Sequence, residues 1–224
     1  MQMGLVPSVP VPRHAFPHLF FALLAFTILA PLATGSQVQR LVYLALSLLV
    51  LIAGIRLSWF VPKTRLALLV LAVPAIVASA LGASHARSPV EAFLLVFTAS
   101  FFILMTVRLL HKIVHDTVVT ADTLYGAASI YLFIGITFAL VYYIISHLQP
   151  GAFYVNATRS ADLIGGWPSY VYFSFVTLST VGYGDITPAT QLVRSVVILQ
   201  VVTGVFYVAV LIGRLVDLYR PSTK

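Results

Sequence analysis

The sequence predicts an all-α membrane protein with six transmembrane helices per chain and one further, re-entrant helix. Its 224 residues are 60% hydrophobic and only 8% charged, which is more apolar surface than a water-soluble domain can bury. Apolar segments of about spanning length recur along the chain. Between the last two lies a shorter apolar run, residues 167–178, followed by a glycine-rich string at residues 180–184.

The six spanning segments are separated by glycine, proline and charged residues. A helix needs about 20 residues to cross the hydrocarbon, and the third segment is the shortest of the six. The first follows Arg13 and could pass for a signal-peptide core, but a further full span soon after it favours a membrane helix. The predicted spans are residues 16–33, 38–60, 66–81, 89–110, 123–148 and 189–218.

The basic residues indicate a topology and no nucleic-acid partner. The net charge is +7, yet the arginines stand singly at the ends of apolar runs and form no basic cluster. With a cytoplasmic N-terminus, nine Lys and Arg residues fall inside and four fall outside. This bias fits the positive-inside rule. We therefore expect a multi-pass protein of the cell membrane with both termini cytoplasmic.

The run at residues 167–178 is too short to cross a bilayer. At about 1.5 Å per residue it covers roughly half the hydrocarbon thickness, which is the pattern of a re-entrant helix and loop. Such backbone is tolerated at membrane depth only where protein covers it or where it lines water. Pro168 suits the first turn, where a missing N–H costs little.

The string after this run is Thr-Val-Gly-Tyr-Gly, followed by Asp185. Residues 172–188 resemble potassium channels of the two-helix pore-domain superfamily, including prokaryotic members and one half of two-pore-domain channels. The resemblance implies a selectivity filter in which backbone carbonyls replace the hydration shell of K+. The carbonyls are those of Thr180, Val181, Gly182 and Tyr183, and the Thr180 hydroxyl adds a lower ring. Consecutive inward carbonyls need alternating backbone hand, which Gly182 and Gly184 permit.

The resemblance also assigns supporting residues around this filter segment, residues 180–184. In the family the residue after the filter, here Asp185, is tied to the pore helix. Phe173 stands where many members have a tryptophan donor, so Tyr172 is the expected substitute. Thr177 and Ser179 offer further oxygens beside the end of the pore helix. Gly204 is the candidate gating hinge of the inner helix, although packing glycines are common in membrane helices.

A single filter string supplies one quarter of a carbonyl ring. We therefore expect a homotetrameric channel in which each chain has three identical subunits as partners within the lipid bilayer. The predicted domains are a flexible arm at 1–15, a four-helix transmembrane domain at 16–111, a linker at 112–122 and a pore domain at 123–224. No cofactor is expected besides K+ as the permeant ion. Six residues follow Leu218, which leaves no obvious cytoplasmic ligand domain.

The fourth predicted span does not carry the arginine ladder of a voltage sensor. It has Glu91 at one end and Arg108 at the other, with no charge between them. Each charge that crosses the field contributes about 2.3 kcal/mol per 100 mV. We therefore predict weak or no intrinsic voltage dependence.

These observations favour a potassium-selective channel that conducts passively, and they leave alternatives. A weakly selective cation channel would follow if the bracing of Asp185 were poor. A component of a potassium uptake transporter is a second alternative, although the complete string occurs only once. A membrane enzyme is disfavoured because the spans hold no clustered catalytic or metal-binding residues.

Overall fold

The computed structural model describes residues 15–29, 37–58, 62–81, 89–115, 120–155 and 166–218. The predicted N-terminal arm, apart from Ala15, lies outside the described residues, as do residues 116–119 of the predicted linker. Over these ranges the chain is mostly helical. The elements in order are α1 (Ala15–Leu29), α2 (Gln37–Ser58), α3 (Pro62–Leu81), α4 (Pro89–His115), α5 (Ala121–Leu148), β1 (Phe153–Val155), α6 (Trp167–Leu178), β2 (Ile186–Pro188) and α7 (Gln191–Leu218).

Every predicted apolar segment forms a helix, but the lengths differ from the prediction. Within the described ranges, three helices are long and apolar enough to cross a membrane: Phe93–Val114, Ala121–Leu148 and Gln191–Gly213. The apolar stretches in the first three helices are shorter, at Phe16–Leu29, Leu44–Gly54 and Leu66–Val77. Of the six predicted spans, three are therefore shown as candidates over the described residues, and the other three stay predictions.

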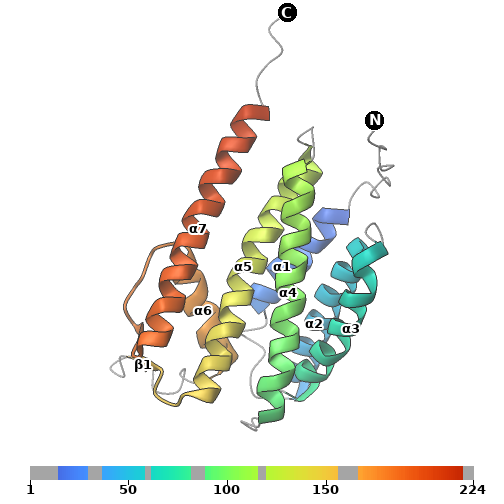
Figure 1. The fold of residues 1–224 in the computed structure, drawn as a ribbon. Coiled ribbons are helices and arrows are strands. Elements are labelled where there is room, and N and C mark those ends of the chain that lie inside the picture. The colour runs from blue at the N-terminus through green and yellow to red at the C-terminus, as the bar shows by residue number, and fades with distance from the viewer. Residues whose placement is uncertain are drawn as a thin grey trace, which may run out of the picture.

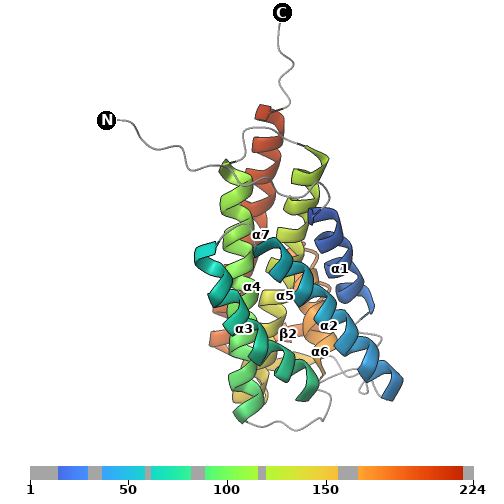
Figure 2. The same cartoon turned by 90° about the vertical axis from the view of Figure 1, so that its right-hand side faces the viewer.

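The helices alternate in direction across the molecule. In Figures 1 and 2, α1, α3 and α5 run one way, whereas α2, α4 and α7 run the other. α4 and α5 pack together in the middle, with α1, α2 and α3 on one side and α6 and α7 on the other (Figure 1). α5 is in contact with α1, α4, α6 and α7. It is therefore the central helix of the chain.

One continuous apolar core joins the first four helices to α5. Phe101 and Phe133 are fully buried, and the ring of Phe133 lies 5.4 Å from that of Phe102. A Cβ at Gly126 would lie 3.1 Å from Ile113 Cδ1 and 3.3 Å from Phe16 Cδ1. The small residue thus lets α5 approach both α4 and α1 closely.

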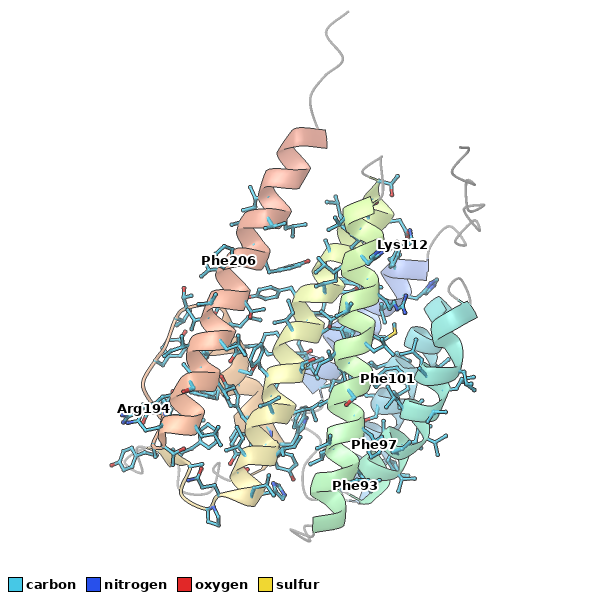
Figure 3. The ribbon with its side chains drawn as sticks, viewed as in Figure 1. Phe93, Phe97, Phe101, Lys112, Arg194 and Phe206 are labelled. Carbon is cyan, nitrogen blue, oxygen red and sulfur yellow. The ribbon has the colours of Figure 1, made fainter. Side chains whose placement is uncertain are left out.

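Helix α4 extends five residues beyond its predicted end and reaches into the predicted linker. One face, including Phe101, Met105 and Leu109, is buried, while Phe93 and Arg108 are exposed. Figure 3 shows Phe93, Phe97 and Phe101 along this helix and Lys112 near its end. Lys112 Nζ lies 5.1 Å above the ring of Phe16, a cation–π contact that ties α4 to the start of α1.

Local signals explain where α5 begins. Thr120 is its N-cap and accepts a hydrogen bond from the Thr123 amide at 3.2 Å. The Thr120 amide in turn donates to Thr123 Oγ1 at 3.3 Å. This reciprocal capping box satisfies two amides that a helix start leaves without partners.

A second, smaller core lies at the C-terminal end of α5, beside a two-stranded antiparallel sheet. β1 and β2 pair antiparallel, with Tyr154 opposite Thr187. The ring of Phe153 packs 5.5 Å from Phe173 and 5.7 Å from Tyr142. Phe173 therefore serves as a buried aromatic core residue, which explains why it needs no polar donor.

Candidate functional site

Helix α6 has the bounds that the sequence predicts, Trp167–Leu178. Pro168 stands in its first turn, after an N-cap at Gly166. One face of the helix is buried against α5 and α7, and its buried residues are Tyr170, Val171, Phe173, Ser174, Thr177 and Leu178. This short helix is therefore held by the two long helices on either side of it in the sequence.

A glycine in α5 makes the seat for α6. A Cβ at Gly135 would overlap the ring of Phe175, so no larger residue fits there without displacing the helix. The carbonyl of Gly135 also accepts a hydrogen bond from Ser174 Oγ at 2.7 Å. Gly135 therefore fixes α6 by shape and by polar contact at the same place.

The end of α6 is tied to the start of the filter segment by backbone hydrogen bonds. The Thr180 amide donates to the Thr177 carbonyl at 3.0 Å, and the Val181 amide donates to the Val176 carbonyl at 3.0 Å. Ser179 Oγ donates back to the Phe175 carbonyl at 2.7 Å. The first residues of the filter segment are thus positioned by α6 itself. In Figure 1 the chain leaves α6 as a loop and passes beside the first turns of α7 before that helix begins.

The backbone of the filter segment alternates in hand. Thr180, Gly182 and Gly184 have φ angles of 61°, 56° and 76°, whereas Val181 and Tyr183 keep negative φ. Positive φ costs glycine nothing, but it is rare and strained for a β-branched residue. Among the described residues, Thr180 is the only non-glycine residue with positive φ. The sequence predicts this conformation at the two glycines and does not reveal it at Thr180.

The side chains of the filter segment are largely exposed within one chain. Val181 is 52% exposed and Tyr183 is 70% exposed. A Cβ placed at Gly182 or Gly184 would meet nothing within 4 Å. Backbone hand, and not crowding within the chain, therefore explains the need for glycine at these two positions.

Asp185, directly after the filter segment, has partners on both carboxylate oxygens. Tyr172 Oη donates to Oδ2 at 2.7 Å, and the Ile186 amide donates to Oδ1 at 3.0 Å. The ring of Tyr172 also stacks on that of Tyr183, with centroids 6.5 Å apart. The structure thus places Tyr172, Tyr183 and Asp185 together at one end of the filter segment.

The tyrosine in this group stays a neutral donor at ordinary pH. Desolvation, the hydrogen bond to Asp185 and the charge of Asp185 raise the pKa of Tyr172 to about 12. A raised pKa means that the hydroxyl form is retained throughout the neutral range. The bond is lost only as the pH rises toward that value.

The residues that follow the filter segment are held by the pairing of β2 with β1. β2 follows Asp185 at once and pairs with β1, which follows α5. The Ala189 amide also donates to the Ala152 carbonyl at 2.9 Å. The segment is therefore held at its start by α6 and at its end by a strand pair.

Gly204, the candidate hinge, lies against the end of α6. A Cβ there would be 2.8 Å from both Leu178 Cδ1 and the Leu178 carbonyl oxygen. Helix α7 runs unbroken through this position, from Gln191 to Leu218. The close approach explains why a glycine stands here, whereas a hinge motion remains a prediction.

Sequence reasoning missed three polar residues that join the helices of the site. Tyr142, Ser174 and Gln200 are fully buried and hydrogen-bonded to one another across α5, α6 and α7. The available signal was Gln200, an amide within the largely apolar middle of α7. Its partners lie 26 and 58 residues away in sequence, so spacing alone could not identify them.

Over the described residues, no group of three His, Cys, Asp or Glu side chains could hold a metal ion. Thr177, a predicted supporting residue, is buried at the base of the filter segment, and Ser179 is exposed there.

Comparison with known proteins places this site in a family. A family model described as "Ion channel" matches residues 129–220, a range that extends from α5 through the filter segment into α7. Two-pore potassium channel 4 of Arabidopsis thaliana is 50% identical over 46 residues, which cover 20% of this chain and 16% of that protein. Potassium channel protein kcv of Paramecium bursaria Chlorella virus 1 is 36% identical over 83 residues, which cover 37% of this chain and 84% of that protein.

The two relatives differ in how much of them this chain spans. It covers most of the viral protein and about a sixth of the plant protein. The identity and coverage of the viral protein are enough to establish kinship, and they agree with the resemblance carried by residues 172–188. The chain therefore belongs to the potassium channel superfamily.

Proposed function

We propose that this protein is a potassium-selective channel whose ion path is lined by the backbone carbonyls of Thr180, Val181, Gly182 and Tyr183. The observation that carries the proposal is the alternation of backbone hand at residues 180–184, with positive φ at every second residue. In an ordinary strand, successive carbonyls point to opposite sides. Alternating left- and right-handed residues turn them to the same side, as a row of ion ligands requires.

The physical demand on such a site is dehydration of the ion. A K+ ion in a narrow path loses its water, and ring-shaped sets of carbonyl oxygens replace that hydration shell. The Thr180 hydroxyl adds oxygens at the base of the path. Strain at a β-branched Thr180 costs about 1–3 kcal/mol, which is tolerated where the surroundings fix the backbone. Here the hydrogen bonds from the end of α6 to Thr180 and Val181 supply that constraint.

A complete ring needs four copies of this segment. We infer a homotetramer with cyclic symmetry, in which each chain has three identical neighbours. The exposure of the filter segment supports this assembly, since Val181 is 52% exposed and Tyr183 is 70% exposed within one chain. The two relatives described above are both named as potassium channels.

The pore helix contributes electrostatics as well as support. The last turn of α6 presents carbonyl groups, and a helix C-terminus carries roughly half a negative charge. In a tetramer, four such ends would converge below the filter. They would lower the energy of a cation waiting there, and Thr177 and Ser179 would add oxygens at the same level.

The alternating helix directions support a topology with both termini on one side of the membrane. α1 begins, and α7 ends, toward the same end of the molecule (Figures 1 and 2). We propose that this end is cytoplasmic, in keeping with the excess of Lys and Arg there. The filter segment then opens to the outside of the cell membrane, with the bilayer around the spanning helices.

Potassium flux from proteoliposomes tests the proposal. The wild-type protein should release K+ from loaded vesicles, much faster than it releases Na+ under the same gradient. Gly182→Ala should reduce K+ flux at least about tenfold, because alanine does not readily adopt positive φ. Gly151→Ala is the matched control. Gly151 also has positive φ, 80°, and an open surrounding, but it lies in the turn after α5.

Three outcomes would contradict the proposal. Equal K+ and Na+ flux through the wild-type protein would indicate a weakly selective cation channel. Flux that saturates at low ion concentration with slow turnover would indicate a transporter component. A Gly182→Ala variant with wild-type flux would show that the filter segment is not the ion path.

A further inference from the structure

A buried polar network connects the three helices that surround the filter segment. Tyr142 of α5, Ser174 of α6 and Gln200 of α7 each have no exposed surface. They lie in a largely apolar core at the level where the short helix α6 is packed between the two long ones. Polar groups at such depth are costly unless they are paired.

The network has a defined direction at every bond. Tyr142 Oη donates to Gln200 Oε1 at 2.6 Å. Gln200 Nε2 donates to the Ser174 carbonyl at 2.9 Å and to Ser174 Oγ at 2.7 Å. Ser174 Oγ donates onward to the Gly135 carbonyl at 2.7 Å. Since the Tyr142 hydroxyl donates and the Ser174 carbonyl only accepts, the orientation of the Gln200 amide is fixed.

Gln200 is the polar centre of this network. Its oxygen and both donor bonds of its nitrogen are used within the chain, so the amide is satisfied without water. Among the residues of α7 whose burial is described, 191–213, the buried ones are Val193, Gln200 and Gly204. Gln200 therefore provides direct hydrogen bonds from α7 to α6.

The position of the network relates it to the filter segment. Ser174 lies six residues before Thr180, and α6 residues after Ser174 accept the amides of Thr180 and Val181. One turn beyond Gln200, Gly204 packs against the carbonyl of Leu178 at the end of α6. α7 thus holds α6 at its middle and at its end, so a shift of α6 would carry the start of the filter segment with it.

We propose that Gln200 is a positioning residue for the filter segment, acting through Ser174 and α6. This inference rests on the proposed potassium channel function and adds to it a named residue outside the filter. Gln200 does not touch the ion. It fixes the rotation and height of α6, and hence the spacing of the carbonyl rings that distinguish K+ from Na+.

The test uses reversal potentials of purified tetramers in planar bilayers, with K+ on one side and Na+ on the other. Gln200→Met keeps the length of the side chain and removes all of its hydrogen bonds. It should raise the Na+ permeability relative to K+ roughly tenfold, as expected when buried polar partners lose their bonds. Ser174→Ala should act in the same direction with a smaller effect.

Ser129→Ala is the matched control. Ser129 is equally buried, but its hydroxyl donates to the Tyr125 carbonyl within α5. It should leave the reversal potential unchanged. Reversal potential is measured on channels that have assembled, so a loss of folded protein alone does not move it. A double variant with both Gln200→Met and Ser174→Ala should change the reversal potential by less than the sum of the two single effects, because both changes remove the bond between Gln200 Nε2 and Ser174 Oγ.

Each possible result either supports or overturns the positioning role of Gln200. If Gln200→Met does not assemble, Ser174→Ala compared with Ser129→Ala carries the test alone. Wild-type selectivity in the variants of Gln200 or Ser174 overturns the positioning role and leaves the proposed function intact. A wild-type protein that does not prefer K+ overturns the proposed function, and this inference with it.

Discussion

Helices α5 and α7 are matched in length and differ in how the chain surrounds them. Each has 28 residues, and each is long and apolar enough to cross a membrane. Yet 61% of the apolar window of α5 is buried within the chain, compared with 11% for α7. α5 is enclosed by α1, α4 and α6, whereas α7 touches its own chain along a narrow stripe that includes Val193, Gln200 and Gly204.

Within one subunit α5 is therefore largely covered, whereas most of the surface of α7 is left exposed. The partners of α5 belong to the same chain. In the proposed tetramer, α7 and the filter segment meet neighbouring subunits, the bilayer and the ion path. Figure 3 shows Phe206 on α7, well apart from the core around Phe101. Phe206 is 66% exposed, while Phe101 is fully buried.

The largest expected effect separates a phenylalanine on α5 from one on α7. Phe133→Ala should destabilise each subunit by about 3–5 kcal/mol, since it leaves a cavity in the shared core. Phe206→Ala should leave the subunit fold nearly unchanged and lower the fraction of tetramer. Thermal unfolding in detergent measures the first effect, and cross-linking measures the second. Equal loss of subunit stability in both variants would contradict the difference in burial between α5 and α7.

A smaller effect should map the stripe along α7 itself. Gly204→Ala should cost about 1–3 kcal/mol through overpacking, because the Leu178 backbone cannot move aside easily. Gly213→Ala is the control, since a Cβ there meets nothing within 4 Å. It should be neutral or slightly stabilising, as alanine favours helix over glycine. Thermal midpoints of the two variants check this. Similar damage at both positions would mean that a neighbour covers α7 beyond the stripe.

The smallest effect concerns the exposed end of the filter segment. Tyr172→Phe keeps the ring that stacks on Tyr183 and removes the bond to Asp185, so we expect a loss of about 1 kcal/mol. The measurable result is shorter channel openings in single-channel recordings. Tyr154→Phe, at an exposed tyrosine of β1, should be silent. Unchanged open times in Tyr172→Phe would show that the hydrogen bond from Tyr172 to Asp185 does not stabilise the filter segment.

The same bond gives a pH dependence of definite sign. The pKa of Tyr172 is raised to about 12, with desolvation as the leading cause and Asp185 adding to it. The contribution of the bond to stability is therefore fully present below the ordinary pKa of tyrosine. It is lost as the pH rises toward about 12. Open times should not vary with this group across the neutral range.

The sequence predicted the local elements well because their signals are local. The bounds of α6 follow from an apolar run between Gly166 and a polar, glycine-rich string, and the helix occupies those residues. The positive φ of Gly182 and Gly184 follows from residue type. That of Thr180 does not, because threonine gives no sign of left-handed backbone.

What the sequence could not predict depends on tertiary packing. The mean hydropathy of α5 and α7 is similar, 2.1 and 2.5. Hydropathy therefore cannot distinguish a helix that its own chain buries from one that its own chain leaves exposed. Gln200 signalled a polar role, but its pairing with Tyr142 and Ser174 depends on how three helices meet. Gly204 suggested a hinge, while the fold reveals a close contact with Leu178 that sequence spacing does not encode.

Selectivity for K+ is tested most directly by the reversal potential of the purified wild-type protein in a planar bilayer. K+ is placed on one side and an equal concentration of Na+ on the other. If the carbonyls of residues 180–183 replace the water of a bare potassium ion, the current should reverse far from zero, at the sign set by K+ leaving its own side. A reversal near zero would mean that the two ions pass alike, and it would contradict the account.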